Sequence, residues 1–158
     1  MRLHKYFLVF LISLFTSISA QASETLTVVH PALAAPTLID NGLPGQSVGD
    51  VRIFQFDAQT TSGDKITVDW IMTTTGVDQS SMGEYRMSAA TFSFGSTTQE
   101  QIVIQGIAQY SSANETLKST VSTTRAVTGG TGKYANASGW METTHLSDGT
   151  WKHVLHLK

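Results

Sequence analysis

Apolar and polar residues alternate with a period of two along most of the chain. The clearest case is the run 65–75, where Ile66, Val68, Trp70 and Met72 share one face. Short runs rich in Val, Ile, Thr and aromatic residues are separated by breaks that contain Gly, Pro, Asn or Asp. No stripe with helical spacing interrupts this pattern. It is typical of an all-β sandwich or barrel.

The pattern predicts eight strands, at residues 24–30, 51–60, 65–75, 83–94, 101–110, 116–128, 137–146 and 150–157. Segment 31–50 holds all three prolines and is expected to be an irregular connection. Eight strands suffice to close a small barrel, whose interior is filled by side chains or holds one small ligand. We therefore predict a small β-barrel.

The first 22 residues have the features of a secretory signal peptide. A basic start, MRLHKY, precedes an apolar run from Phe7 to Ile18, and Ala20-Gln21-Ala22 supplies a small-x-small cleavage pattern. The run is shorter than the roughly 20 residues of a membrane-spanning helix, although an uncleaved anchor is the alternative. We expect signal peptide 1–22 and one domain, 23–158, that is secreted or periplasmic.

Composition narrows the classes of partner. The chain has 158 residues, with 10 Lys+Arg against 12 Asp+Glu, and loss of the leader also removes Arg2 and Lys5. Without a basic stripe, nucleic-acid binding has no electrostatic basis. The chain has no Cys, which excludes disulfides and thiolate metal sites. The histidines do not converge by local spacing, so we expect neither a metal nor a cofactor, and no stable membrane insertion.

The stretch 125–139, RAVTGGTGKYANASG, tests a nucleotide-binding alternative. A phosphate-binding loop requires Ser or Thr after Gly-Lys, but Tyr134 follows Lys133. A dinucleotide fingerprint requires a helix next, but the residues after Ser138 alternate like a strand. The glycines are therefore predicted to form a tight connection between neighbouring strands.

The same stretch resembles a signature of the allene oxide cyclases and dirigent proteins, in which a Gly-Gly-Thr-Gly-type turn precedes a strand. GDVRIFQFD (49–57) and SFGSTTQEQIVIQG (93–106) are similar to other pieces of those families, in the same order. The resemblance implies an eight-stranded antiparallel barrel, commonly trimeric, with an apolar lumen that guides cyclisation or coupling without a cofactor. The positions that correspond to the families' functional residues hold Phe56, Ile71 and Ser138, which differ in chemical type.

The last hairpin suggests candidate chemistry. If Asp148-Gly149 is a two-residue turn, Glu142 and His153 share the more apolar, inward face. A carboxylate and an imidazole in a dry lumen could act as acid and base. Alternatively, the two groups satisfy each other, face water, or lie outside because the turn is longer.

We carry forward three hypotheses. In the first, the lumen binds a small hydrophobic molecule without chemistry, through Trp70, Met72, Ile104, Trp140 and Leu155. In the second, the protein is a cofactor-free isomerase or cyclase in which Glu142, His153 or Tyr110 polarises the substrate. In the third, it is a structural barrel filled by its own side chains. By resemblance, the barrel is also expected to form a homo-oligomer, a trimer.

Overall fold

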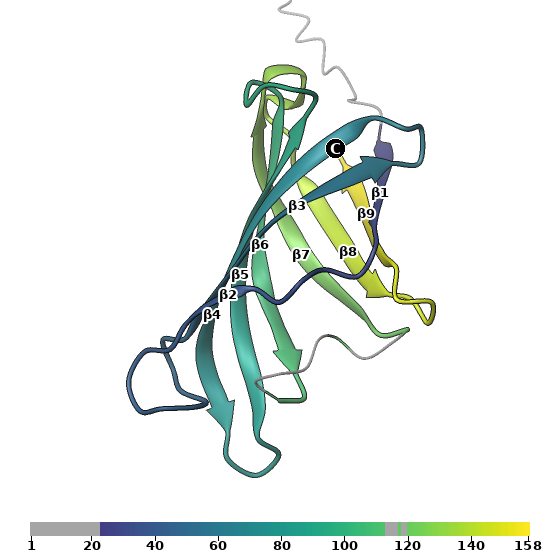
Figure 1. The fold of residues 1–158 in the computed structure, drawn as a ribbon. Coiled ribbons are helices and arrows are strands. Elements are labelled where there is room, and N and C mark those ends of the chain that lie inside the picture. Colours follow the sequence, from purple (N-terminus) through teal and green to yellow (C-terminus); the bar gives the residue numbers. More distant parts are fainter. Residues whose placement is uncertain (1–22, 113–116, 118–119) are drawn as a thin grey trace, which may run out of the picture.

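The computed structural model describes residues 23–112, 117 and 120–158. Within them, one antiparallel sheet runs in the order β1-β9-β8-β7-β6-β5-β4-β3-β2, and a pairing of β1 with β3 closes it (Figure 1). The strands are β1 Glu24–His30, β2 Thr37–Ile39, β3 Val51–Thr60, β4 Lys65–Asp78, β5 Gly83–Phe94, β6 Gln101–Tyr110, β7 Ser122–Thr131, β8 Gly139–His145 and β9 Trp151–Leu157. The protein is thus an eight-stranded antiparallel barrel with the short β2 added along β3, as the alternation and the resemblance predicted.

The glycine stretch connects two neighbouring antiparallel strands, as predicted, but its parts are placed differently. The strand expected at 116–128 is β7, at Ser122–Thr131, so Gly129 and Gly130 lie within it. A single 3-10 turn, η1 Gly132–Tyr134, then leads to β8. A side chain at Gly130 would bring its Cβ within 2.6 Å of the Gln101 carbonyl oxygen. The glycine therefore permits close backbone packing without ending the strand.

The loop between β8 and β9 is longer than the predicted two-residue turn. His145 pairs with Trp151, and Thr143 pairs with His153, so residues 146–150 form the connection. The Leu146 amide donates to the Thr150 carbonyl, and the Asp148 carboxylate accepts from the Thr150 amide. The register differs by one residue from the predicted pairing, and a shift of one residue reverses which side chains face inward.

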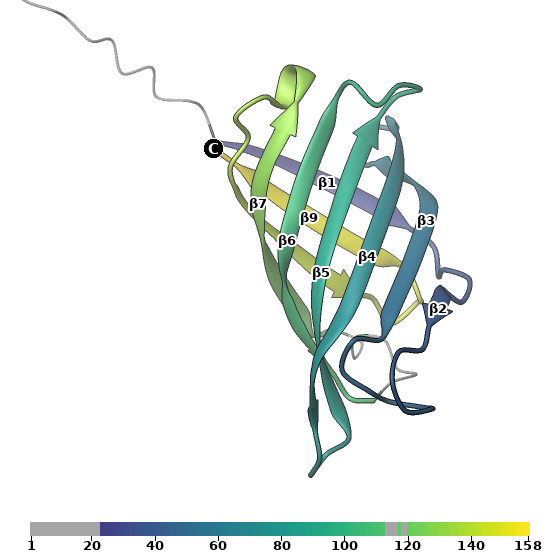
Figure 2. The ribbon, with the colours of Figure 1, turned by 90° about the vertical axis from the view of Figure 1, so that its left-hand side faces the viewer.

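The barrel has a packed half and a hollow half. Near the end with the β7–β8 connection, the lumen is filled by a core that includes Val28, Ile66, Val68, Phe92, Ile102, Ile104, Met141 and Leu155, each at most 1% exposed. Figure 2 shows β4, β5 and β6 running the full length of the wall between this end and the opposite one. At the opposite end the lumen is open.

No helix among the described residues is long and apolar enough to span a membrane. The predicted signal peptide, 1–22, lies outside the described residues.

Candidate functional site

A cavity of about 650 Å³ occupies the open half of the lumen. The connection from β1 to β2 crosses this half (Figure 1), and its residues 32–36 line the cavity. Leu117, between β6 and β7, also lines the cavity. The remaining lining residues come from strands on all sides of the barrel: His30, Leu38, Arg52, Phe54, Phe56, Trp70, Met72, Arg86, Tyr110, Arg125, Thr143, His145, Trp151 and His153. A pocket of this size, mostly apolar with a few converging polar groups, is typical of small-molecule sites.

A larger groove of about 820 Å³ lies where β1, β3 and β4 meet. It is more open, and its lining includes Asp57, Gln59, Lys65 and Thr67, whose side chains point away from the lumen. Because ligand sites enclose most of their ligand's surface, we take the lumen cavity as the functional site.

Aromatic side chains form much of the cavity wall. Phe54 and Phe56 alternate with outward-facing residues on β3 and remain only partly buried, since they border the cavity. Trp151 stacks on His145, with ring centroids 4.5 Å apart. Flat rings of this kind offer a planar apolar ligand a large contact area at little cost in conformational entropy.

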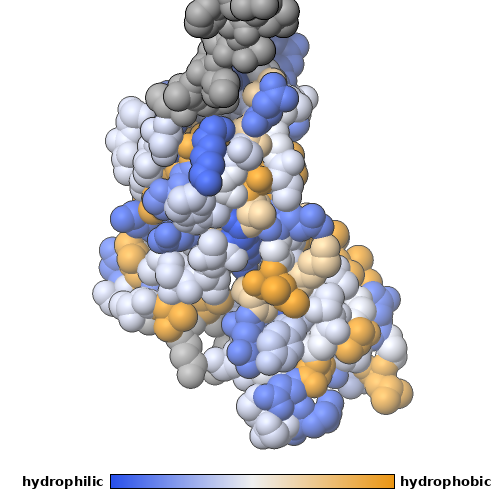
Figure 3. All heavy atoms as spheres, turned by 180° about the vertical axis from the view of Figure 1, so that it is seen from behind, coloured by the Kyte–Doolittle hydropathy of each residue, from blue (hydrophilic) through white to orange (hydrophobic). Residues whose placement is uncertain are grey.

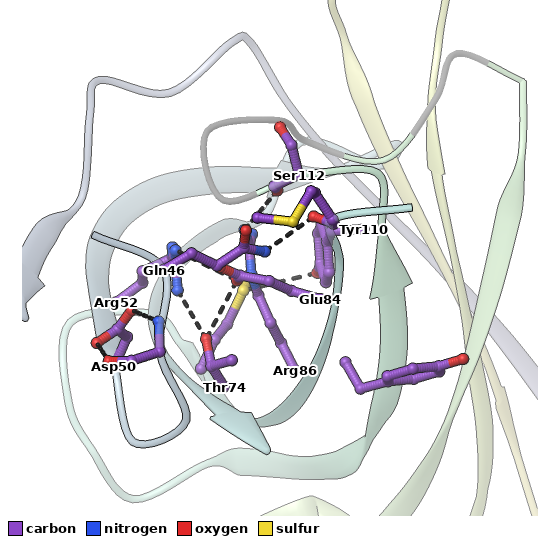
Figure 4. Close-up of polar contacts among 12 residues, drawn as sticks. Gln46, Asp50, Arg52, Thr74, Glu84, Arg86, Tyr110 and Ser112 are labelled. Carbon is purple, nitrogen blue, oxygen red and sulfur yellow. Dashed lines mark hydrogen bonds and ion pairs between the residues drawn. The ribbon is translucent and has the colours of Figure 1, made fainter. Parts of the chain in front are cut away.

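A buried Arg–Glu–Arg cluster closes one side of the cavity (Figure 4). The Arg86 Nε donates to Glu84 Oε2 at 2.6 Å, and Arg52 Nη2 lies 3.3 Å from the same oxygen. Thr74 also donates its hydroxyl to Glu84 and accepts from Arg52. The Glu84 side chain is fully buried, so its charge requires these partners. Asp50 is a second buried carboxylate whose charge acts on Arg52, so two carboxylates accompany the two guanidinium groups.

Arg125 is a third buried cation on the cavity wall, and its partners are of a different kind. Its guanidinium donates to the hydroxyls of Thr123, Thr143 and Tyr110, at 2.9, 3.4 and 3.4 Å. Burial lowers the pKa of Arg125, although a guanidinium remains protonated at neutral pH. Within the described part of the chain, Arg125 forms no ion pair with a carboxylate.

A hydrogen-bonded chain continues from Arg125 to the connection that lines the cavity. Thr143 Oγ1 lies 3.1 Å from His153 Nδ1, and His153 Nε2 lies 3.1 Å from His30 Nε2. His30 Nδ1 lies 2.7 Å from the Pro31 carbonyl oxygen. Arg125 only donates and the carbonyl only accepts, so one consistent arrangement follows: His30 carries its proton on Nδ1, and His153 carries its proton on Nε2.

Both histidines are neutral in this arrangement. Burial lowers the pKa of His30, outweighing the opposite effect of the hydrogen bond to Pro31. Burial holds the pKa of His153 well below its ordinary value, and a positive charge on His30 or on Arg125 lowers it further. A second proton on His30 would place two N–H donors against each other at the 3.1 Å contact. A second proton on His153 would occupy Nδ1, the atom that accepts from the Thr143 hydroxyl.

The sequence-predicted residues fall into three groups. His153, Tyr110, Trp70 and Met72 line the cavity, while Ile104 and Leu155 belong to the packed half. Glu142 and Trp140 lie on the outside, and Glu142 pairs at 3.6 Å with His156 there. The prediction that Glu142 and Trp140 face inward is therefore wrong, because the five-residue loop shifts β8 by one residue.

Sequence reasoning missed Arg52, Arg86, Arg125 and Glu84, as well as His30. A signal was present: Arg52 is in phase with Phe54 and Phe56, and Arg125 is in phase with Val127. Charged residues are rarely fully buried unless they are paired, so an arginine on the apolar face of a strand indicates a polar site in the lumen.

No protein-family model matches the chain, and no curated protein matches its sequence. Solved structures do match. Pyocyanin demethylase is similar with a TM-score of 0.65 and 23% identity, over 87% of this chain and 100% of that one. The pterocarpan synthase dirigent protein GePTS1 is similar with a TM-score of 0.56 and 15% identity, over 92% of this chain and 97% of that one. The resemblance to the allene oxide cyclase and dirigent barrels is thus confirmed at the level of the fold.

Proposed function

We propose that the protein is exported and that its lumen binds a small, predominantly apolar aromatic molecule. The observation that carries this proposal is the half-empty lumen: a cavity of about 650 Å³ with aromatic walls, where a purely structural barrel would be filled by its own side chains. Both similar structures are named for the chemistry of small molecules, the one a demethylase of pyocyanin and the other a pterocarpan synthase. Export is supported by the leader-like residues 1–22.

Binding is tested by fluorescence titration of the purified protein with N-phenylnaphthylamine (NPN), an uncharged aromatic probe that brightens in apolar sites. We expect saturable binding of one probe per barrel. Phe54→Ala removes part of the cavity wall and should weaken NPN several-fold. Ile53→Ala, the neighbouring change on the outer face, should leave binding unchanged. Binding that is absent, or that is equally weak in both variants, would refute a lumen site. Mass spectrometry of co-purifying small molecules would then identify the natural ligand.

A cofactor-independent isomerase or cyclase is the second candidate, and Tyr110 favours it. The Tyr110 hydroxyl receives a hydrogen bond from Arg125, and its ring lies against the Arg86 guanidinium at 4.1 Å, so two cations adjoin one phenol at the cavity wall. Such a phenol could polarise a carbonyl or hydroxyl of a bound substrate. For a substrate identified by co-purification, Tyr110→Phe should lower turnover while leaving its affinity within a few-fold.

Export is tested separately, by expressing the full chain in a secreting host. The intact mass of the released protein should correspond to cleavage after Ala22. Retention of the leader would support the uncleaved anchor instead.

A further inference from the structure

Arg125 is a buried positive charge without a matching negative charge in the described part of the chain. The residue is 2% exposed, and its hydrogen-bond acceptors are three hydroxyl groups. Its Nε–H has no acceptor among the described residues, and neither does the indole N–H of Trp70. The Arg125 Cζ lies 5.1 Å from the centre of the Trp70 ring. Burying a charged group without a counter-ion costs free energy of folding, because the group loses its hydration.

The surrounding groups do not supply that counter-ion. Glu84 is shared between Arg52 and Arg86, the charge of buried Asp50 also acts on Arg52, and the two histidines next to Arg125 are neutral. Among the described residues, Arg125 is therefore left as a positive charge without a carboxylate of its own. In a lumen of low dielectric constant, this charge attracts an anion more strongly than the same charge would in water.

The backbone is shaped to admit Arg125. Gly106 on β6 lies beneath its side chain, and a Cβ at this position would stand 2.9 Å from Arg125 Cγ and 3.1 Å from its Cα. A side chain at position 106 would collide with the stem of Arg125. Because Gly106 leaves this space, the guanidinium extends along the wall of the lumen.

We propose that the natural ligand is an aromatic anion, a carboxylate or phenolate on a planar ring system, whose negative group is neutralised by Arg125. This inference rests on the proposed lumen site and specifies its ligand class. The rings lie against the aromatic wall, and the negative group faces Arg125 and the indole N–H of Trp70. Charge-assisted hydrogen bonds of this kind favour the anion over its neutral counterpart by roughly 10- to 100-fold.

Two probes that share one skeleton separate the inference from the proposed function. Anilinonaphthalenesulfonate (ANS) differs from NPN by one sulfonate. We expect the purified protein to bind ANS at least tenfold more tightly than NPN, one molecule per barrel. Non-fluorescent naphthoate should displace bound NPN at lower concentration than naphthamide does. If NPN itself fails to bind, the lumen site is refuted. If NPN binds but the anions have no advantage, only the aromatic-anion inference is refuted.

Substitutions of Arg125 test whether the preference for ANS over NPN depends on this residue. Arg125→Gln should remove most of the preference for ANS over NPN, whereas Arg125→Lys should retain part of it. Lys152→Gln removes one positive charge from the exposed side of β9 and should leave the preference unchanged. Equal losses in Arg125→Gln and Lys152→Gln would refute the role of Arg125. If Arg125→Gln does not fold, the unaltered protein and Arg125→Lys provide the test. The role of Arg125 is refuted if the unaltered protein shows no preference for ANS over NPN, or if Arg125→Lys shows the full preference.

Discussion

At the scale of single residues, the two buried histidines give the barrel a defined response to pH. His30 and His153 are 4% and 1% exposed, and the pKa of each is lowered in the folded protein. The unfolded chain therefore binds more protons than the folded chain once the pH falls below about 6.5. Above this pH the two histidines do not reduce the free energy of unfolding. As the pH falls below it, the free energy of unfolding decreases.

We expect the free energy of unfolding to be nearly constant from pH 8.5 to about 7.5. It should then decline between about pH 6.5 and 5.5 by up to about 1.4 kcal/mol per pH unit for each histidine. Urea unfolding at a series of pH values measures this slope. His153→Gln should reduce the slope by about half, although it also lowers stability at neutral pH. Val154→Ala, at a partly exposed position of the same strand, changes no titratable group and should leave the slope unchanged. A pH-independent stability would contradict the neutral pair.

Glu142, which lies outside the lumen, is expected to matter little for stability or for ligand binding. Its contact with His156 is 3.6 Å long, and both side chains are partly exposed, so the pair should contribute little to stability. We expect Glu142→Gln to change the free energy of unfolding by less than about 0.5 kcal/mol. NPN binding should also be unchanged. A large loss of binding in this variant would indicate that Glu142 reaches the lumen after all.

At the scale of elements, the packing of β6 against β7 determines where Arg125 lies. Gly106→Ala would place a methyl group within 2.9 Å of Arg125 Cγ and 3.1 Å of its backbone. The change should cost about 1–3 kcal/mol of stability, as overpacking does, and should weaken ANS more than NPN because the guanidinium is displaced. Gly76→Ala is a suitable control, since its Cβ would meet Tyr85 at an ordinary 3.5 Å. Denaturant unfolding and probe titration of both variants measure the two effects.

The strands themselves could be predicted from the sequence, but one register could not. Alternation in runs such as 65–75 reflects a local rule, since every second residue faces the lumen. The register of β8 against β9 depends instead on the length of the loop at 146–150. Asp148-Gly149 is compatible with a turn of two residues as well as with the observed five-residue loop, in which Asp148 binds the Thr150 amide. One residue of difference was sufficient to place Glu142 outside.

The candidate site was less predictable than the strands, because it joins residues that are distant in the chain. Arg52, Thr74 and Glu84 come from β3, β4 and β5, and His30 meets His153 across 123 residues. Which half of the lumen remains hollow depends on the summed volumes of side chains from all strands. Alternation identifies inward positions, but it does not show which of them contact one another.

At the scale of the whole molecule, the outer surface carries an apolar stripe that a single barrel leaves uncovered. Ile53 pairs with Ile71 across β3 and β4, and Met87 pairs with Ile107 across β5 and β6. These four side chains are 39–56% exposed. Figure 3 shows further hydrophobic residues at the surface of the lower half of the molecule. Contiguous exposed apolar side chains of this kind mark association surfaces.

We expect copies of the chain to associate through this stripe, in keeping with the trimers that the resemblance implies. Light scattering coupled to size exclusion should give a mass above that of one chain, and Ile71→Asp combined with Ile107→Asp should shift the protein to monomers. Charges on an apolar interface disrupt it, because they would be buried without partners. Gln59→Asp lies on β3 outside the stripe and should leave the mass unchanged. NPN binding by the monomeric variant would further show that each barrel encloses its own site. A monomeric unaltered protein would mean that the stripe has another role.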